Sequence, residues 1–448
     1  MEARKRAREE DEPGHGLCLV HGHNCQQAGV QGAVRGLGCS GKLFAGRLTD
    51  LQGRLRALPG GSSTAEALSV AHAACCSGRL SDVDEATAAV LDAGWTALHS
   101  GHWSQVDGAW RSAYMAAAFL SAASETSGAT ALRTIDLGLM VGDTSFRSEL
   151  LRAADHLESA APQAAIERGS CGDFRRLEPH AVEEPRPLSG TLPSLPRLRL
   201  PSLAFFYNQH MVPATPCVLT EVLDGWPART TRPWSDSHYL KALLAERTVP
   251  VEVGSHYLDD GFEERLVTFA QFFESHIEPP PPPPGASRAY LAQHQLFEQC
   301  PALRRDLVTP DYCLLSLDDD SQEGEGEGEG RSDDDVRVNA WFGPAATLSP
   351  LHYDRSHNLL CQVVGSKYVR LYAPEHSERL YAHTSGPHQV SSRIVDPDRV
   401  DASAFPRFAE APYVDVVLGE GEVLYIPPRW WHFVEARETS FSVSFWWR

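Results

Sequence analysis

Two histidines and one aspartate in the last third of this 448-residue chain have the residue types and spacing of a metal site. His352 and Asp354 stand two residues apart in TLSPLHYDRSHNLL, at a predicted strand end, where side chains at i and i+2 project from the same face. His432 follows in GEVLYIPPRWWHFVEA, where a strand is expected to end at Pro427-Pro428 and a short loop to deliver the imidazole. Two imidazoles and one carboxylate on one face of an octahedron leave three positions open, as in non-haem iron(II) oxygenases.

A lysine thirteen residues beyond Asp354 extends this pattern. Lys367 begins the second strand of a hairpin predicted at Gly365-Ser366, where glycine supplies the positive φ of a type II′ turn. An isolated ammonium that points inward is costly to bury and needs an anion, which a bound dicarboxylate would provide. A solvated strand position is the alternative for Lys367. Zinc-assisted hydrolysis is an alternative for the triad, but it leaves Lys367 without a purpose.

The elements that must position these residues are short strands in the second half of the chain. Tight turns separate them, and Gly419-Glu420-Gly421 is expected to join one pair as a second hairpin. Many short strands with tight turns predict a double-sheet barrel of the jelly-roll or cupin kind. The predicted strands are Pro216–Leu219, Thr248–Val253, Val336–Phe342, Leu359–Val364, Lys367–Tyr372, Val414–Leu418, Glu422–Ile426 and Ser440–Trp446.

The chain as a whole is expected to be an α+β protein of more than one domain. Its length exceeds the roughly 250 to 300 residues that one core supports. Small and aliphatic residues at helical spacing predict an N-terminal helical domain at 46–160, after a disordered tail at 1–45. A proline-rich linker is expected at 161–200 and the barrel at 201–448, with surface insertions at 279–286 and 318–335.

The net charge and the composition of the chain limit the kinds of partner that it is expected to bind. The net charge is −19, but the run from Asp318 to Asp335 holds ten acidic residues against one arginine and contributes −9, leaving −10 elsewhere. Such a run is typical of a solvated loop. The remainder is not basic enough to bind a nucleic-acid backbone, so no nucleic-acid binding is expected. No apolar run approaches the roughly 20 residues of a membrane span, so no membrane association is expected. The sequence carries no signal for an oligomeric state.

The amino-terminal tail bears on location. Ten cysteines without a secretory signal indicate reduced thiols, as in the nucleus or the cytoplasm. The basic run from Arg4 to Arg8 fits a nuclear-import signal, or a merely solubilising patch. The cysteines and histidines from Cys18 to Cys25 lack a second half-site, so we expect a tail and no zinc site. Nuclear location is the expectation, with the cytoplasm as an additional site.

Long motifs, in order, resemble the jumonji-C oxygenases. They are NAWFGPAATLSPLHYDRSHNLLCQVVGSKYVRLYAP, GEVLYIPPRWWHFVEA and SFSVSFWW, together with PSLAFFYNQHMVPATPCVLTEVLDGWPA, TVPVEVGSHYLDD and YLAQHQLFEQCPALRRDL upstream. The resemblance covers residues 200 to 448 and continues, more weakly, in LHSGHWSQVDGAWRSAY and LRTIDLGLMVG. It implies a double-stranded β-helix, the fold of a jumonji-C domain, after the helical domain.

The resemblance also implies roles for single residues. It makes His352, Asp354 and His432 the iron(II) ligands and the catalytic centre. It places Lys367 and Tyr290 on the distal carboxylate of 2-oxoglutarate, with dioxygen as the second cosubstrate. Ser349 and Asn358 would line the cosubstrate site, Trp341, Gln293 and Trp446 would wall the pocket, and Glu252 would face a cationic substrate side chain.

Similar family members include protein arginyl hydroxylases and demethylases of histone methyl-lysine, plant members among them. Glu252 favours hydroxylation of a protein arginine, because a carboxylate can bind a guanidinium bidentately, whereas methyl-lysine prefers an aromatic cage. Histone N-methyl-lysine demethylation, with a role in chromatin and transcription, is the alternative. A non-catalytic cupin-like scaffold or binding protein is a second alternative.

Overall fold

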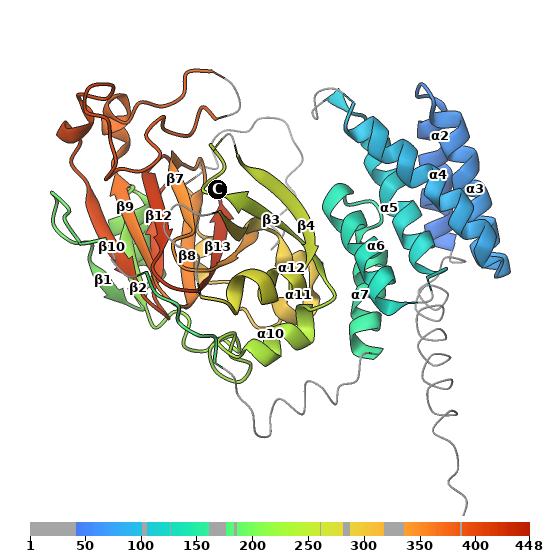
Figure 1. The fold of residues 1–448 in the computed structure, drawn as a ribbon, viewed down its shortest axis with the longest axis horizontal. Coiled ribbons are helices and arrows are strands. Elements are labelled where there is room, and N and C mark those ends of the chain that lie inside the picture. The colour runs from blue at the N-terminus through green and yellow to red at the C-terminus, as the bar shows by residue number, and fades with distance from the viewer. Residues whose placement is uncertain are drawn as a thin grey trace, which may run out of the picture. The chain divides into compact units, whose positions relative to one another are not determined.

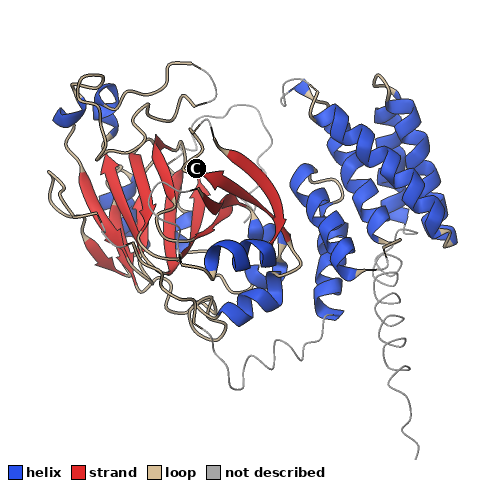
Figure 2. Ribbon diagram, viewed as in Figure 1, coloured by secondary structure: helices blue, strands red, loops and turns tan. Residues whose placement is uncertain are grey.

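The computed structural model describes residues 42–100, 105–125, 127–160, 176–182, 186–259, 261–280, 287–317, 336–385 and 388–448. The expectations for the tail before residue 42, for residues 281–286 of the insertion expected at 279–286 and for the acidic run at 318–335 lie outside these residues. The chain divides into two compact units, Met1–Ala161 and Pro162–Arg448. The first is helical and the second is built around β-sheets (Figures 1 and 2), which confirms the predicted fold class.

The first unit consists of helices that pack on their sequence neighbours. Their bounds are α2 Lys42–Arg56, α3 Gly61–Ser77, α4 Leu80–Leu98, α5 Gly108–Ala122, α6 Gly128–Val141 and α7 Arg147–Ala160. Asp107 caps α5 by accepting a hydrogen bond from the Ala109 amide, 2.8 Å away. Gly138 allows α6 to approach α5, because a Cβ there would lie 2.8 Å from the Cβ of Ala118.

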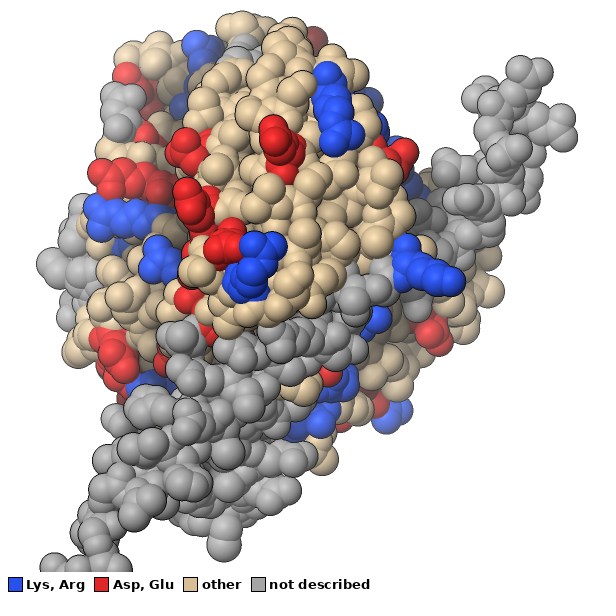
Figure 3. Space-filling view, turned by 90° about the vertical axis from the view of Figure 1, so that its right-hand side faces the viewer, with Lys and Arg blue, Asp and Glu red and all other residues tan. Residues whose placement is uncertain are grey.

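The surface drawn in Figure 3 carries its charges in scattered positions. Acidic and basic side chains of the described residues lie singly or in small groups among uncharged ones. On this face the described residues form no continuous basic stripe. Within the described ranges, none of the helices combines the length and the apolar character that a bilayer span requires.

The second unit contains two sheets. The larger has the order β1-β2-β11-β8-β13-β6-β5-β3-β4 and the smaller β10-β9-β12-β7. Among the strands of the described residues, only β1 and β2 pair in parallel. The strands are β1 Arg197–Arg199, β2 Cys217–Thr220, β3 Thr248–Gly254, β4 Glu263–Thr268, β5 Arg288–His294, β6 Arg337–Gly343, β7 Leu348–Tyr353, β8 His357–Val364, β9 Lys367–Tyr372, β10 Val414–Leu418, β11 Val423–Ile426, β12 Trp431–Ala436 and β13 Ser440–Trp447.

The two sheets face one another across a shared interior. Leu360 and Leu424 of the larger sheet belong to the same buried cluster as Val369 and Leu371 of the smaller one. The opposite face of the larger sheet packs on short helices through an aromatic core, in which Trp234 stacks on Phe297 at 5.7 Å. These helices are α9 Leu203–Phe206, α10 Ser237–Leu244, α11 Phe269–Phe272, α12 Leu296–Gln299 and α13 Pro301–Arg304. Alternation of inward and outward side chains therefore decides what reaches the interior.

The strand predictions are confirmed in part. Strands β9 and β10 have the predicted bounds, and the other six predicted strands are found within two residues. Strands β1, β4, β5 and β12 were not predicted, and β7 was anticipated only through the strand end expected at His352 and Asp354. The loop expected to deliver His432 is in fact β12, where His432 pairs with His352 of β7.

Both predicted hairpins are wrong. Strand β8 pairs with β11 and β13, whereas β9 pairs with β10 and β12, so Gly365 carries the chain from one sheet to the other. Gly421 does the same between β10 and β11. Both glycines have positive φ, 72° and 89°, as a sharp reversal requires. The local turn was foreseen, but hydrogen bonding to distant strands decided the pairing.

The expected linker at 161–200 also differs from the structure. Its described carboxyl-terminal part, 186–200, is attached to the barrel: β1 pairs with β2, and the amides of Ser189 and Gly190 donate to the carboxylate of Asp415. Prolines prevent a helix here, but they permit extended chain that a sheet can bind.

Candidate active site

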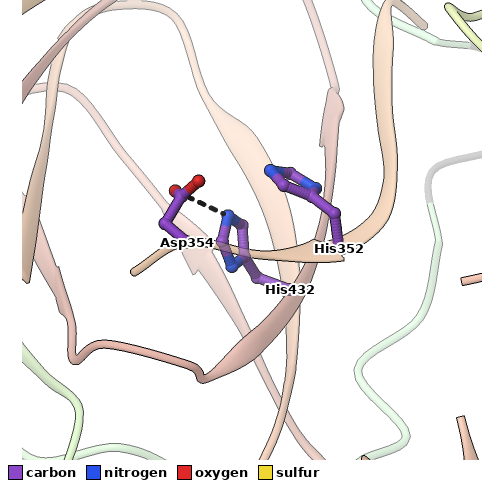
Figure 4. A group of neighbouring side chains, drawn as sticks. All are labelled: His352, Asp354 and His432. Carbon is purple, nitrogen blue, oxygen red and sulfur yellow. Dashed lines mark ion pairs between the residues drawn. The ribbon is translucent and has the colours of Figure 1, made fainter. Parts of the chain in front are cut away.

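Three side chains converge at one end of the smaller sheet. His352 and His432 are paired residues of β7 and β12, and their ring centroids lie 4.2 Å apart. Asp354 follows β7 directly, and its Oδ2 lies 3.7 Å from Nε2 of His432. One ligand atom from each of the three residues lies within 4.8 Å of the others, and the side chains point toward one another (Figure 4). This arrangement can hold a divalent metal ion.

The two imidazoles are oriented in the same way. Nδ1 of His352 lies 2.7 Å from the carbonyl oxygen of Pro350, and Nδ1 of His432 lies 2.9 Å from that of Trp430. A carbonyl oxygen only accepts, so each Nδ1 carries the hydrogen and each Nε2 keeps its lone pair. Such a partner fixes the tautomer and the ring orientation of a metal-ligating histidine.

Electrostatics favour a neutral imidazole at His432. Burial, and then the nearby His352, lower the pKa of His432 to about 4, although Asp354 acts in the opposite direction. A neutral imidazole is the form that binds a metal. The chain around Asp354 is held by the Arg429 amide, which donates to the Asp354 carbonyl oxygen at 2.7 Å. Arg429 adopts positive φ, 67°, so a sharp turn before β12 brings the two segments together.

A buried lysine lies in the same interior. Lys367 is 2% exposed, and its Nζ donates to the Tyr290 hydroxyl at 3.2 Å. Among the described residues it has no carboxylate partner, and burial lowers its pKa to about 7. Burial also raises the pKa of Tyr290, so this phenol stays protonated and can donate to an anion. The pair can therefore bind a carboxylate between two donors.

These residues line one cavity of about 380 Å³. Three buried polar atoms that face it have no hydrogen-bond partner: Asp354 Oδ2, Asn358 Oδ1 and Trp446 Nε1. Unpaired buried polar atoms are rare and costly, so three in one cavity indicate a polar ligand. The donor set thus fits a metal ion with a small organic acid. The cavity is lined by Tyr290, Trp341, Ser349, His352, Asp354, Asn358, Leu360, Lys367, Ile426, His432, Val434, Ser444 and Trp446.

Sequence reasoning missed Ser444. Its hydroxyl accepts a hydrogen bond from Nε1 of Trp341 at 2.8 Å and so orients that indole in the cavity wall. Ser444 and Trp446 lie on the same face of β13, because strand side chains alternate. Counting back two residues from Trp446 would have found Ser444.

Gln293 does not line this cavity. The β5–β6 register shifts between Leu291 and His294, and Gln293 has positive φ, 47°. Such a bulge breaks the alternation of side chains, and Gln293 is exposed. Its expected place in the pocket wall therefore differs from the structure.

Glu252 lies beside a neighbouring cavity of about 270 Å³, not in the metal cavity. The two cavities share Tyr290, which is the pairing partner of Glu252 across β3 and β5. Burial and the like charge of Glu264 raise the pKa of Glu252 to about 7. Because an incoming cation would favour the ionised carboxylate, this position suits a positively charged side chain.

Comparison with known protein families identifies the class of protein to which this chain belongs. A family model described as a cupin-like domain matches residues 202–448. A second model, described as KDM8-like N-terminal ARM repeats, matches residues 64–170. With the site above, the fold defines a cupin-like oxygenase of the class that depends on iron(II) and 2-oxoglutarate, which sets aside the scaffold alternative.

Curated relatives identify the family. Lysine-specific demethylase 8 of Danio rerio is 36% identical over 367 residues, which cover 80% of this chain and 86% of the relative. Lysine-specific demethylase JMJ30 of Arabidopsis thaliana is 39% identical over 394 residues, covering 81% and 85%. Jumonji C domain-containing protein 5 of Drosophila melanogaster is 35% identical over 367 residues, covering 80% and 85%. This chain belongs to the jumonji-C family and confirms the resemblance found in the sequence.

Proposed function

We propose that this oxygenase oxidises a C–H bond in a positively charged side chain of a protein, with N-methyl-lysine as the first candidate. The observation that carries the cationic substrate is Glu252, a half-buried carboxyl group in the cavity next to the metal cavity. The printed names of two relatives, lysine-specific demethylases, favour methyl-lysine over the arginine that the sequence alone suggested. Histones are then natural substrates, and the nucleus is the expected location.

Arginine hydroxylation is the second candidate, and one observation favours it. Glu252 offers two carboxylate oxygens, which match the fork of a guanidinium better than they match a methylated ammonium. Both candidates begin with oxidation of a C–H bond. An alcohol on a carbon of arginine is stable, whereas an alcohol on an N-methyl group collapses and releases formaldehyde.

In the proposed mechanism the chain holds and orients three groups. His352, Asp354 and His432 would hold iron(II) through Nε2 and carboxylate oxygens. Lys367 and Tyr290 would bind the distal carboxylate of 2-oxoglutarate, while Asn358 and Ser349 lie along its side of the cavity. When bound, iron with 2-oxoglutarate and dioxygen supplies conversion of C–H to C–OH, with succinate and carbon dioxide as the other products.

The side chains that form the walls of the metal cavity exclude water from it. Trp341 is fixed by Ser444, and Leu360, Ile426 and Val434 add apolar surface. A dry cavity strengthens the contact between Lys367 and an anion. Glu252 would hold the substrate cation on the far side of Tyr290, so cosubstrate and substrate approach from two cavities.

The test uses the full chain with iron(II), 2-oxoglutarate and air. One histone peptide carries dimethyl-lysine and a matched peptide carries unmodified lysine and arginine, and the products are analysed by tandem mass spectrometry. Loss of a methyl group with formaldehyde supports demethylation, and gain of one oxygen on arginine supports the second candidate. If neither peptide changes while substrate-free succinate forms, the oxygenase stands and both substrate proposals fail. His352→Ala is the inactive control.

A further inference from the structure

A short segment before the first strand crosses the outer face of the smaller sheet. We call residues 186–192 the strap. The amides of Ser189 and Gly190 donate to the two carboxylate oxygens of Asp415 in β10, at 2.7 and 3.1 Å. The amide of Leu192 donates to the carbonyl oxygen of Tyr413 at 3.0 Å. The strap is therefore fixed to the edge strand of the sheet that carries both histidines.

Arg186, at the start of the strap, reaches across this sheet. Its guanidinium forms a bidentate pair with Asp396, with N–O distances of 2.9 and 2.8 Å. The same group bonds the carboxylates of Asp398 and Glu435 and lies over the ring of Phe433, 4.9 Å from its centroid. The Arg186 side chain is only 14% exposed, so these interactions are screened little by water.

Two of the residues that Arg186 contacts, Phe433 and Glu435, are outward-facing members of β12. Phe433 and Glu435 alternate with His432 and Val434, and the latter two line the metal cavity. Arg186 thus binds the outer side of the strand whose inner side presents a candidate metal ligand. Because His432 lies on the same strand as Phe433 and Glu435, a rotation or slip of β12 would also move His432.

The pairing of β12 with β7 is irregular beside His432. His432 pairs with His352 and Val434 pairs with Ser349, so two residues of β7 stand opposite Phe433 alone. This is a β-bulge, which re-aims the side chains beside it. Phe433 is the residue of β12 that stands opposite the bulge in β7, and its ring lies under the Arg186 guanidinium.

We propose that Arg186 is a positioning residue of the metal centre. By holding Phe433 and Glu435 it fixes β12 at the bulge and so aims His432 at His352 and Asp354. The inference rests on the proposed metal site. It makes the strap part of the catalytic machinery, although the sequence suggested a linker.

The test measures metal binding without turnover. Arg186→Met in the full chain is titrated with Mn(II) under electron paramagnetic resonance, and its thermal unfolding is recorded beside the wild type. We expect about tenfold weaker Mn(II) binding, at the low end of what loss of a metal-site support causes. The matched control is Arg197→Met. Arg197 follows the strap, pairs with Glu422 at 2.7 Å beside β11 and donates to the Val417 carbonyl oxygen of β10. Since β9 separates β10 from β12, Mn(II) affinity should stay within twofold.

A folded Arg186→Met protein with wild-type Mn(II) affinity overturns the proposal, as does an equal loss in Arg197→Met. Should Arg186→Met fail to fold, Glu435→Gln decides, because it leaves the Asp396 pair intact: weaker Mn(II) binding supports the proposal and unchanged binding overturns it. If the wild type binds Mn(II) no better than His352→Ala, the metal site itself fails, and the inference falls with it.

Discussion

The two sheets that face each other across the cavity contribute opposite kinds of side chain. The smaller sheet supplies the charged and metal-ligating groups, and the larger sheet supplies uncharged side chains, among them the Tyr290 hydroxyl that can donate to an anion. From the smaller sheet come His352, His432 and Lys367, with Asp354 directly after β7; from the larger come Tyr290, Trp341, Asn358, Leu360, Ile426, Ser444 and Trp446.

The outer faces of the two sheets, which point away from the metal cavity, also differ in the contacts that hold them. The larger sheet is covered by helices through an aromatic core, to which Trp234 and Phe441 contribute. The smaller sheet packs on an apolar cluster that includes Tyr368 and Phe433, and it also carries ion pairs, in which Arg186 and Arg370 share Asp398. Apolar packing is tolerant of small shifts, whereas bidentate and charged contacts are directional. The comparison indicates that the sheet with the chemistry is held by the more directional contacts.

The largest effect is expected where the smaller sheet meets the metal. His352→Ala removes one of three ligands, so Mn(II) affinity should fall by more than about 100-fold, beyond what loss of a supporting residue causes. Substrate-dependent succinate formation should disappear with it. Undiminished binding in a calorimetric titration would remove the basis of the comparison. Thermal unfolding checks that the variant is folded.

Lys367→Met should act on the cosubstrate alone. Loss of a charged hydrogen bond costs roughly 1.5–3 kcal/mol, so the KM for 2-oxoglutarate should rise by about 10- to 150-fold. Mn(II) affinity should remain, because Lys367 contacts Tyr290 and no metal ligand. The apoprotein should unfold at higher temperature, since a buried ammonium is replaced by an apolar side chain of similar length. An unchanged KM would show that Lys367 does not bind the distal carboxylate.

The same lysine predicts a pH dependence. Burial lowers the pKa of Lys367 from 10.5 to about 7, and an anion binds only its protonated form. Below pH 7 the affinity for 2-oxoglutarate should be constant, and above it the affinity should fall by up to about tenfold per pH unit, because binding must take up a proton. Titration of the Mn(II)-loaded protein between pH 6.5 and 8.5 measures this. A flat profile in the wild type, as expected for Lys367→Met, contradicts it.

On the larger sheet the expected effects are smaller. Ser444→Ala leaves the Trp341 indole without its acceptor, at a cost of roughly 1–3 kcal/mol for an unpaired buried donor. We expect the fluorescence of the protein to shift and the KM for 2-oxoglutarate to rise several-fold, with Mn(II) affinity unchanged. A loss of Mn(II) binding would contradict the conclusion that metal binding depends on the smaller sheet alone.

The smallest effect is expected for Gln293→Ala. Gln293 is exposed at a bulge and lines neither the metal cavity nor the neighbouring one. Stability should change by no more than about 0.5 kcal/mol, and the KM for 2-oxoglutarate should stay within twofold. A tenfold rise in that KM would place Gln293 at the cosubstrate after all. Steady-state kinetics decides.

Several site features could be read from short stretches of sequence. His352 and Asp354 share a face because strand side chains alternate, and Trp341 and Trp446 lie on strands whose bounds were predicted closely. The pattern failed where alternation is interrupted. At Gln293 a bulge turns the side chain out, and at Gly365 the chain changes sheets, because partners far away in sequence compete for its hydrogen bonds.

By itself, the sequence determined the order of helical and β regions, the family and the local geometry around His352, since all of these depend on residues close together in the chain. The tertiary structure alone decided that His432 stands opposite His352, that Glu252 lies in a second cavity behind Tyr290, and that Arg186 supports β12 from outside. These depend on strand register and on bulges, which are set by hydrogen bonds between segments that local patterns do not connect.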